Sequence, residues 1–194
     1  MKNEIITVNG REYTLNHSSV QIEVKELINR YRDTEKFIAY CKECNRYNTC
    51  WACPPFDFDT DEYLVSHSTA RIIGTKICLD KEIINSYQGD GCTKISYEII
   101  GAVRKGLDNM LLNMEKQHPE SKAFFAGTCH LCPTGECTKI VGKPCISPEK
   151  IRPSLEALGF DVSRISAELL NIEMLWSSNE VLPEYFTLVS GFFM

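Results

Sequence analysis

Long apolar runs and an excess of basic charge are what this sequence lacks. No uncharged apolar stretch approaches the roughly 18 residues of a membrane-spanning helix, and residues 1–15 lack the apolar region of a secretion signal. The 21 lysine and arginine residues are outnumbered by 26 aspartate and glutamate residues, for a formal net charge of -5. Nucleic-acid-binding proteins usually present a basic face. We therefore expect a cytoplasmic protein that binds neither membranes nor nucleic acid.

Patterns typical of a catalytic site are also scarce. The chain has four histidines, its carboxylates are spread out, and no serine–histidine–acid arrangement follows from their spacing. The stretch Gly89-Asp90-Gly91-Cys92 is too short to be a phosphate-binding loop. His130 lies inside a cysteine motif, where we expect it to tune the site or face solvent. These residues leave open whether the protein is an enzyme.

Length and composition indicate one globular domain. The chain has 194 residues and 43% hydrophobic content, which is enough to bury a core without disulfides. We predict a single metal-binding domain over residues 1–194, with an N-terminal hairpin and helix in 1–33. The order of the expected elements predicts an α+β fold, in which helices pack on a small mixed sheet and two cysteine-rich loops bind metal.

Local patterns place the individual elements. Asn9-Gly10 between two β-rich stretches is a strong hairpin signal, and apolar residues at helical spacing predict an amphipathic helix over 93–117. Pro119 ends that helix, and Pro148 suits the first turn of a later one. Further helices are expected over 18–31, 34–40, 59–64, 148–159 and 161–170, strands over 71–79, 123–126 and 185–189, and a loop over 89–92.

Cysteine, in contrast, is abundant, with ten residues in the chain. In a reducing compartment disulfides are disfavoured, and clustered cysteines more often bind metal or carry out redox chemistry. Cys78 is expected to fill the core, and Cys92 to be a loop or helix-cap residue. The other eight form two groups, Cys41, Cys44, Cys50 and Cys53 followed by Pro54-Pro55, and Cys129, Cys132, Cys137 and Cys145.

Each group can supply four thiolates to one centre, because zinc and an iron–sulfur cube both accept four cysteines. Zinc modules usually separate their two cysteine pairs by about 15–20 residues. Here the pairs are separated by far fewer residues, and prolines lie beside the cysteines, as in ferredoxin-type sites. We therefore predict one or two [4Fe–4S] clusters, with zinc as the alternative.

Cys50 is the weaker ligand of the first group, since Cys41, Cys44 and Cys53 alone form a three-cysteine site with an open metal position. An open position favours chemistry over simple electron relay. The two groups can also exchange ligands across space. The spacing leaves one shared centre and two separate centres open.

Two stretches of the chain carry a family resemblance. They are Cys41…Cys44…Tyr47…Trp51-x-Cys53-Pro54-Pro55 and Phe124-x-x-Gly127-x-Cys129-x-x-Cys132, continued by Cys137 and by Cys145-x-x-Pro148-Glu149-x-x-Arg152-Pro153-Ser154-Leu155-Glu156-Ala157-x-Gly159-x-Asp161-Val162. Over roughly residues 40–190 the chain resembles the prokaryotic predicted metal-binding proteins known as domain of unknown function 2284, and residues 1–33 lie outside this resemblance. The resemblance implies a soluble iron–sulfur protein of anaerobic metabolism without an established reaction. It also favours Cys41, Cys44 and Cys53 as ligands over Cys50.

The leading hypothesis is a cytoplasmic iron–sulfur protein that transfers electrons to or from a redox protein partner, or assists a larger enzyme. One alternative is a structural or adaptor protein whose loops are stabilised by zinc. A second alternative is an enzyme with an open iron site at the first cysteine group. The oligomeric state is left open.

Overall fold

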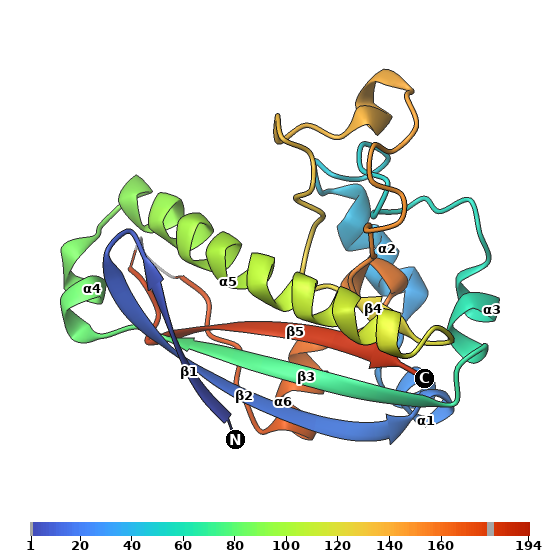
Figure 1. The fold of residues 1–194 in the computed structure, drawn as a ribbon, viewed down its shortest axis with the longest axis horizontal. Helices are drawn as coiled ribbons and strands as arrows, with labels where there is room; N and C mark the ends of the chain where they lie inside the picture. The colour runs from blue at the N-terminus through green and yellow to red at the C-terminus, as the bar shows by residue number, and fades with distance from the viewer. Residues whose placement is uncertain (1, 178–180) are drawn as a thin grey trace.

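The computed structural model describes residues 2–177 and 181–194. Within them, a five-stranded sheet has the order β1-β2-β3-β5-β4 (Figure 1). Each neighbouring pair of strands runs antiparallel. The strands are β1 (Lys2–Val8), β2 (Arg11–Glu23), β3 (Thr69–Cys78), β4 (Lys122–Phe124) and β5 (Tyr185–Phe193).

The predicted α+β class is confirmed, but the prediction of a mixed sheet is wrong. The helical connection after β3 carries the chain to an edge strand, β4, which pairs with β5 and not with β3. It therefore creates no parallel pair. The helices are α1 (Val24–Tyr31), α2 (Thr34–Lys42), α3 (Thr60–Val65), α4 (Lys81–Ser86), α5 (Asp90–Gln117) and α6 (Val162–Leu170), with 3-10 turns η1 (Thr138–Val141) and η2 (Glu156–Leu158).

Several local predictions are confirmed. The hairpin turns at Asn9-Gly10, where both residues have positive φ angles, and the long helix α5 ends just before Pro119. The Asp59 side chain accepts hydrogen bonds from the first amides of α3, and Asp161 does the same at α6. Short polar caps thus begin these helices, as capping chemistry requires.

Three boundaries differ from the predictions. The helix expected from residue 18 begins at Val24, because residues 18–23 continue β2 and pair with β3. The expected loop over 89–92 ends early, since α5 begins at Asp90. The helix expected over 148–159 is reduced to the turn η2. Pro153 explains this loss, because proline lacks an amide donor and disfavours helical geometry in the preceding residue.

The core lies on both faces of the sheet. α5 buries Ile95, Ile99 and Val103 against one face, whereas α1 and α6 pack on the other together with Leu155 and Phe160 (Figure 1). Within the described part of the chain, no helix combines the length and the apolar character needed to cross a membrane.

The two cysteine-rich segments project side by side from one end of the sheet. Residues 41–58 begin in the last turn of α2, and residues 127–155 follow β4, so 68 residues separate the segments in the chain. Figure 1 shows them beyond the C-terminal half of α5. The fold therefore places both predicted metal-binding loops in one region.

Candidate metal centre

The first segment presents its cysteines on two tight turns. The amide of Cys44 donates to the carbonyl of Cys41 at 3.0 Å, and the amide of Cys53 donates to the carbonyl of Cys50 at 3.1 Å. Each turn closes over one cysteine pair, with two residues between the sulfur-bearing positions. Two thiols so close in the chain can face a single centre.

The second segment is fastened to α5 at both ends. At its start, Arg104 donates from Nη2 to the carbonyl of Thr128 at 2.5 Å, immediately after Gly127, whose φ of 80° is the left-handed region that glycine adopts without strain. At its end, Arg152 donates from Nε to Glu115 Oε1 at 2.7 Å. The helix therefore sets the position of Cys129, and it anchors the chain after Cys145.

Cys50 joins the two segments. Cys50 is 1% exposed, and its thiol lies near the thiols of Cys129, Cys53 and Cys137. These contacts lower the pKa of Cys50, whereas its proximity and burial raise the pKa values of Cys53 and Cys129. The backbone amide of Trp51 also points at Cys137 Sγ, 3.5 Å away. Cys50 and Trp51 of the first segment therefore lie against Cys129 and Cys137 of the second.

The remaining thiols of the second segment lie around the same region. Burial raises the pKa of Cys132, and the neighbouring charges of Cys137 and Cys145 raise it further. Cys132 in turn contributes to the raised pKa of Cys129. Cys132 therefore lies near enough to Cys129, Cys137 and Cys145 for their charges to interact.

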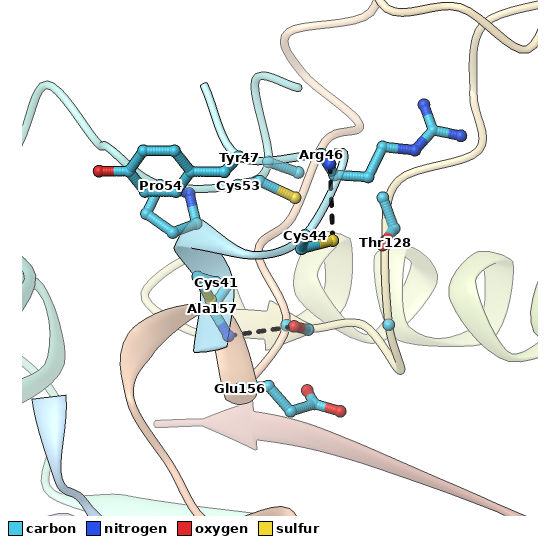
Figure 2. Close-up of a pocket in the computed structure, with 12 residues that line it drawn as sticks. Cys41, Cys44, Arg46, Tyr47, Cys53, Pro54, Thr128, Glu156 and Ala157 are labelled. Carbon is cyan, nitrogen blue, oxygen red and sulfur yellow. Dashed lines mark hydrogen bonds between the residues drawn. The ribbon is translucent and has the colours of Figure 1, made fainter. Parts of the chain in front are cut away.

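Three cysteines of the first segment surround a cavity. Cys41, Cys44 and Cys53 line a space of about 190 Å³ together with Gly127 and Glu156 (Figure 2). A single water needs roughly 10–15 Å³ on the same scale, so the cavity has room for a group of several atoms. Burial raises the pKa of Cys41, followed in effect by the charges of Cys44 and Glu156.

A known family model covers most of the chain. The family model described as "Predicted metal-binding protein (DUF2284)" matches residues 25–191. The chain belongs to this family. The resemblance predicted from the cysteine stretches is therefore confirmed, and the match begins within residues 1–33, for which the sequence indicated no relationship. No curated protein and no solved structure matched the chain.

The family is thus one of predicted metal-binding proteins. Among the described residues, no three histidine, cysteine, aspartate or glutamate side chains converge closely enough to hold a single metal ion. Cys41, Cys44 and Cys53 instead line the same cavity.

Polar contacts hold the two segments against each other. Lys139 reaches the carbonyl of Cys50 at 3.5 Å and lies 5.3 Å from the centre of the Trp51 ring. Trp51 donates from Nε1 to the carbonyl of Lys143 at 3.2 Å. Arg46 reaches the carbonyl of Gly135 at 3.5 Å. Cations therefore gather beside the thiols, where they can offset negative charge.

Two site residues, Arg104 and Glu156, were missed by the sequence analysis. The Arg104 and Asp108 side chains on α5 are 12% and 5% exposed, and Arg104 Nη2 lies 4.0 Å from Asp108 Oδ2. Burial lowers the pKa of Arg104, while the charges of Asp108, Cys129 and Glu156 oppose that shift. His130 Nε2 lies 2.7 Å from Asp108 Oδ2. In the sequence, the opposite charges of Arg104 and Asp108 lie four residues apart beside the apolar residues of α5. This spacing could have indicated Arg104 as a site residue.

The two cysteines outside the groups lie elsewhere in the fold. Cys78 ends β3, where Asn16 donates to its sulfur at 3.2 Å. Cys92 is buried in the first turn of α5. A substitution of Cys78 can therefore serve as a control for substitutions within the two cysteine groups.

Proposed function

We propose that the protein is a cytoplasmic iron–sulfur protein with two [4Fe–4S] centres that passes single electrons to and from a redox partner. The observation that carries this proposal is that two cysteine-rich segments, distant in the chain, lie side by side at one end of the sheet, with Cys50 buried where they touch (Figure 1). The first centre would use Cys41, Cys44 and Cys53. The second would use Cys129, Cys132, Cys137 and Cys145.

The donor set fits such centres. Iron–sulfur clusters are held by cysteine thiolates, and thiolates gathered in a partly buried place need a cation, because an uncompensated buried charge is costly. The cavity bounded by Cys41, Cys44 and Cys53 has room for a multi-atom group. Zinc also accepts thiolates, which makes a structural zinc protein the alternative that the experiment must separate.

An iron–sulfur centre, when bound, supplies a one-electron redox couple whose potential depends on nearby hydrogen bonds and solvent exposure. The chain provides both influences. The Trp51 and Ser147 amides point at Cys137 and Cys145 sulfurs, at 3.5 Å and 3.4 Å, while the buried side chains of Cys50 and Ala52 keep water from the junction.

Metal analysis tests the proposal directly. We expect anaerobically purified protein to contain iron and acid-labile sulfide at about eight each per chain, with a brown colour that bleaches on reduction. Iron would identify a redox role. One or two zinc ions without sulfide or colour would instead contradict it and identify a structural or adaptor protein.

We further propose that the redox partner docks on the tip of the second segment. Ile140, Val141 and Ile146 are 53%, 68% and 56% exposed, and residues 137–147 include Lys139 and Lys143 but no acidic residue. This local positive charge contrasts with the net charge of -5. An electron-transfer protein with an acidic rim therefore fits this surface.

A charge reversal tests this docking surface. Lys143→Glu should slow reduction by a strongly acidic [2Fe–2S] ferredoxin about tenfold at low ionic strength, because rim charges act mainly on association rates. Stopped-flow absorbance measures the rate, and added salt should narrow the difference. Lys94→Glu, on the distant start of α5 (Figure 1), is the control. Equal rates for the two variants would place the partner elsewhere.

A further inference from the structure

We propose that a cavity between α5 and the β1–β2 hairpin binds a small amine whose apolar body is the size of two fused rings. The cavity has a volume of about 340 Å³, whereas about 150 Å³ is enough to hold a benzene molecule. The described residues that line it come from β1, β2 and α5, and none belongs to the cysteine-rich segments. This site is therefore independent of the proposed metal centres.

The walls of the cavity are mostly apolar. Ile6 of β1 and Leu15 of β2 line it from the sheet, and Val103, Leu107 and Met110 line it from α5. Small-molecule sites in proteins are usually concave and lined by apolar side chains, with a few polar groups that orient the ligand. An apolar ring can therefore be buried here between the helix and the hairpin.

Gly106 makes room for such a ring on the helix side. Glycine stabilises a helix interior less than alanine does, and no neighbouring group requires glycine here, because a Cβ on Gly106 would meet nothing within 4 Å. Gly106 lines the cavity, so its missing side chain widens it. A Cβ on Gly101 would also meet nothing within 4 Å, but Gly101 is not among the described lining residues. The two glycines thus form a matched pair for an experiment.

The polar side of the cavity holds a carboxylate that a ligand can reach. Glu4 lines the cavity, and its side chain is 57% exposed. Among the described residues that line the cavity, Glu4 is the one acidic residue, and there is no lysine or arginine. A negative charge beside apolar walls fits a ligand with a cationic amine and an apolar body. It disfavours a carboxylic acid of the same shape, because like charges repel.

His17 fixes the position of this carboxylate. Its Nε2 atom lies 3.4 Å from Glu4 Oε2, and its Nδ1 atom lies 2.9 Å from Thr75 Oγ1. Thr75 pairs directly with His17 across the sheet and is only 1% exposed, so the strand beneath holds the imidazole ring in place. Because His17 also lines the cavity, the carboxylate and the ring together form its polar side, where the amine would lie.

Two probes with the same indole ring test the proposal. Tryptamine carries an ammonium group on a short arm, and indole-3-propionate carries a carboxylate on an arm of the same length. Isothermal titration calorimetry measures the binding of each probe to the wild-type protein, Gly106→Ala, Gly101→Ala and Glu4→Gln. Thermal unfolding checks that the variants fold, and both glycine variants should have raised melting temperatures, because alanine favours a helix more than glycine does.

We expect the wild-type protein to bind tryptamine about tenfold more tightly than indole-3-propionate, because Glu4 attracts the first and repels the second. Gly106→Ala should weaken tryptamine binding about tenfold, since its methyl group takes up room in the cavity, whereas Gly101→Ala should leave the affinity unchanged. Glu4→Gln should bind the two probes about equally.

Three results would overturn the proposal. They are the absence of tryptamine binding, equal affinities of the wild-type protein for the two probes, and equal affinities of the two glycine variants for tryptamine. None of them depends on the iron content of the protein, so a failure here is distinct from a failure of the proposed function.

Discussion

Replacing Cys145 with serine should remove the second centre and lower the iron and sulfide content by about half, from near eight to near four per chain. Cys145 follows η1, and its charge acts on Cys132. The amide of Ser147 points at its sulfur at 3.4 Å. A serine hydroxyl is a poor replacement for a thiolate ligand, and the remaining three cysteines would bind the cluster weakly.

The matched control for this variant is Cys78→Ser. Cys78 is a free cysteine at the end of β3, in the sheet and away from both cysteine-rich segments. The iron content of Cys78→Ser should therefore equal that of the wild type. Anaerobic metal analysis and the visible spectrum provide the measurement. Unchanged iron in Cys145→Ser would refute the assignment of Cys145 as a ligand.

Replacing Arg152 with methionine should destabilise the fold by about 3–5 kcal/mol, the range for breaking a buried ion pair. The Arg152 and Glu115 side chains are only 13% and 10% exposed, and Glu115 also accepts from the amide of Ala123 at 2.6 Å. The variant leaves Glu115 buried without its cation. Urea unfolding of the metal-loaded protein measures the loss.

The Arg152–Glu115 pair also predicts that the free energy of unfolding depends on pH. Burial raises the pKa of Glu115, but hydrogen bonds from Arg152 and Ala123 outweigh it, so the net pKa lies below the ordinary value of 4.5. Because the folded pKa is depressed, this stabilisation is present above pH 4.5 and is lost as the pH falls through the lowered pKa. Arg152→Met should therefore weaken the dependence of the unfolding free energy on pH in this acidic range.

An exposed ion pair provides the comparison for this variant. Arg164 and Glu168 on α6 are 53% and 41% exposed, and such pairs contribute about 0–1 kcal/mol. Arg164→Met should therefore change the unfolding free energy far less than Arg152→Met. Equal losses in the two variants would show that Arg152 does not act through a buried pair.

Local features followed from the sequence because they depend on neighbouring residues. The hairpin at Asn9-Gly10 and the caps at Asp59 and Asp161 are set by backbone preferences and short-range hydrogen bonds. The predicted helix start at residue 18 was wrong because the conformation there depends on residues distant in the chain. Residues 18–23 have an apolar spacing that also fits a helix, and only their pairing with β3 keeps them extended.

By itself, the sequence determined that the chain has two groups of four cysteines and that short turns bring paired cysteines together. It also determined that the chain belongs to a family of predicted metal-binding proteins. The tertiary structure alone decided which distant groups meet. Cys50 lies near Cys129 and Cys137, and Glu156 lines the cavity of the first group. These contacts form because α5 and the antiparallel sheet bring together two segments that 68 residues separate in the chain. Spacing along the chain carries no information about such contacts, since they arise from the packing of whole elements.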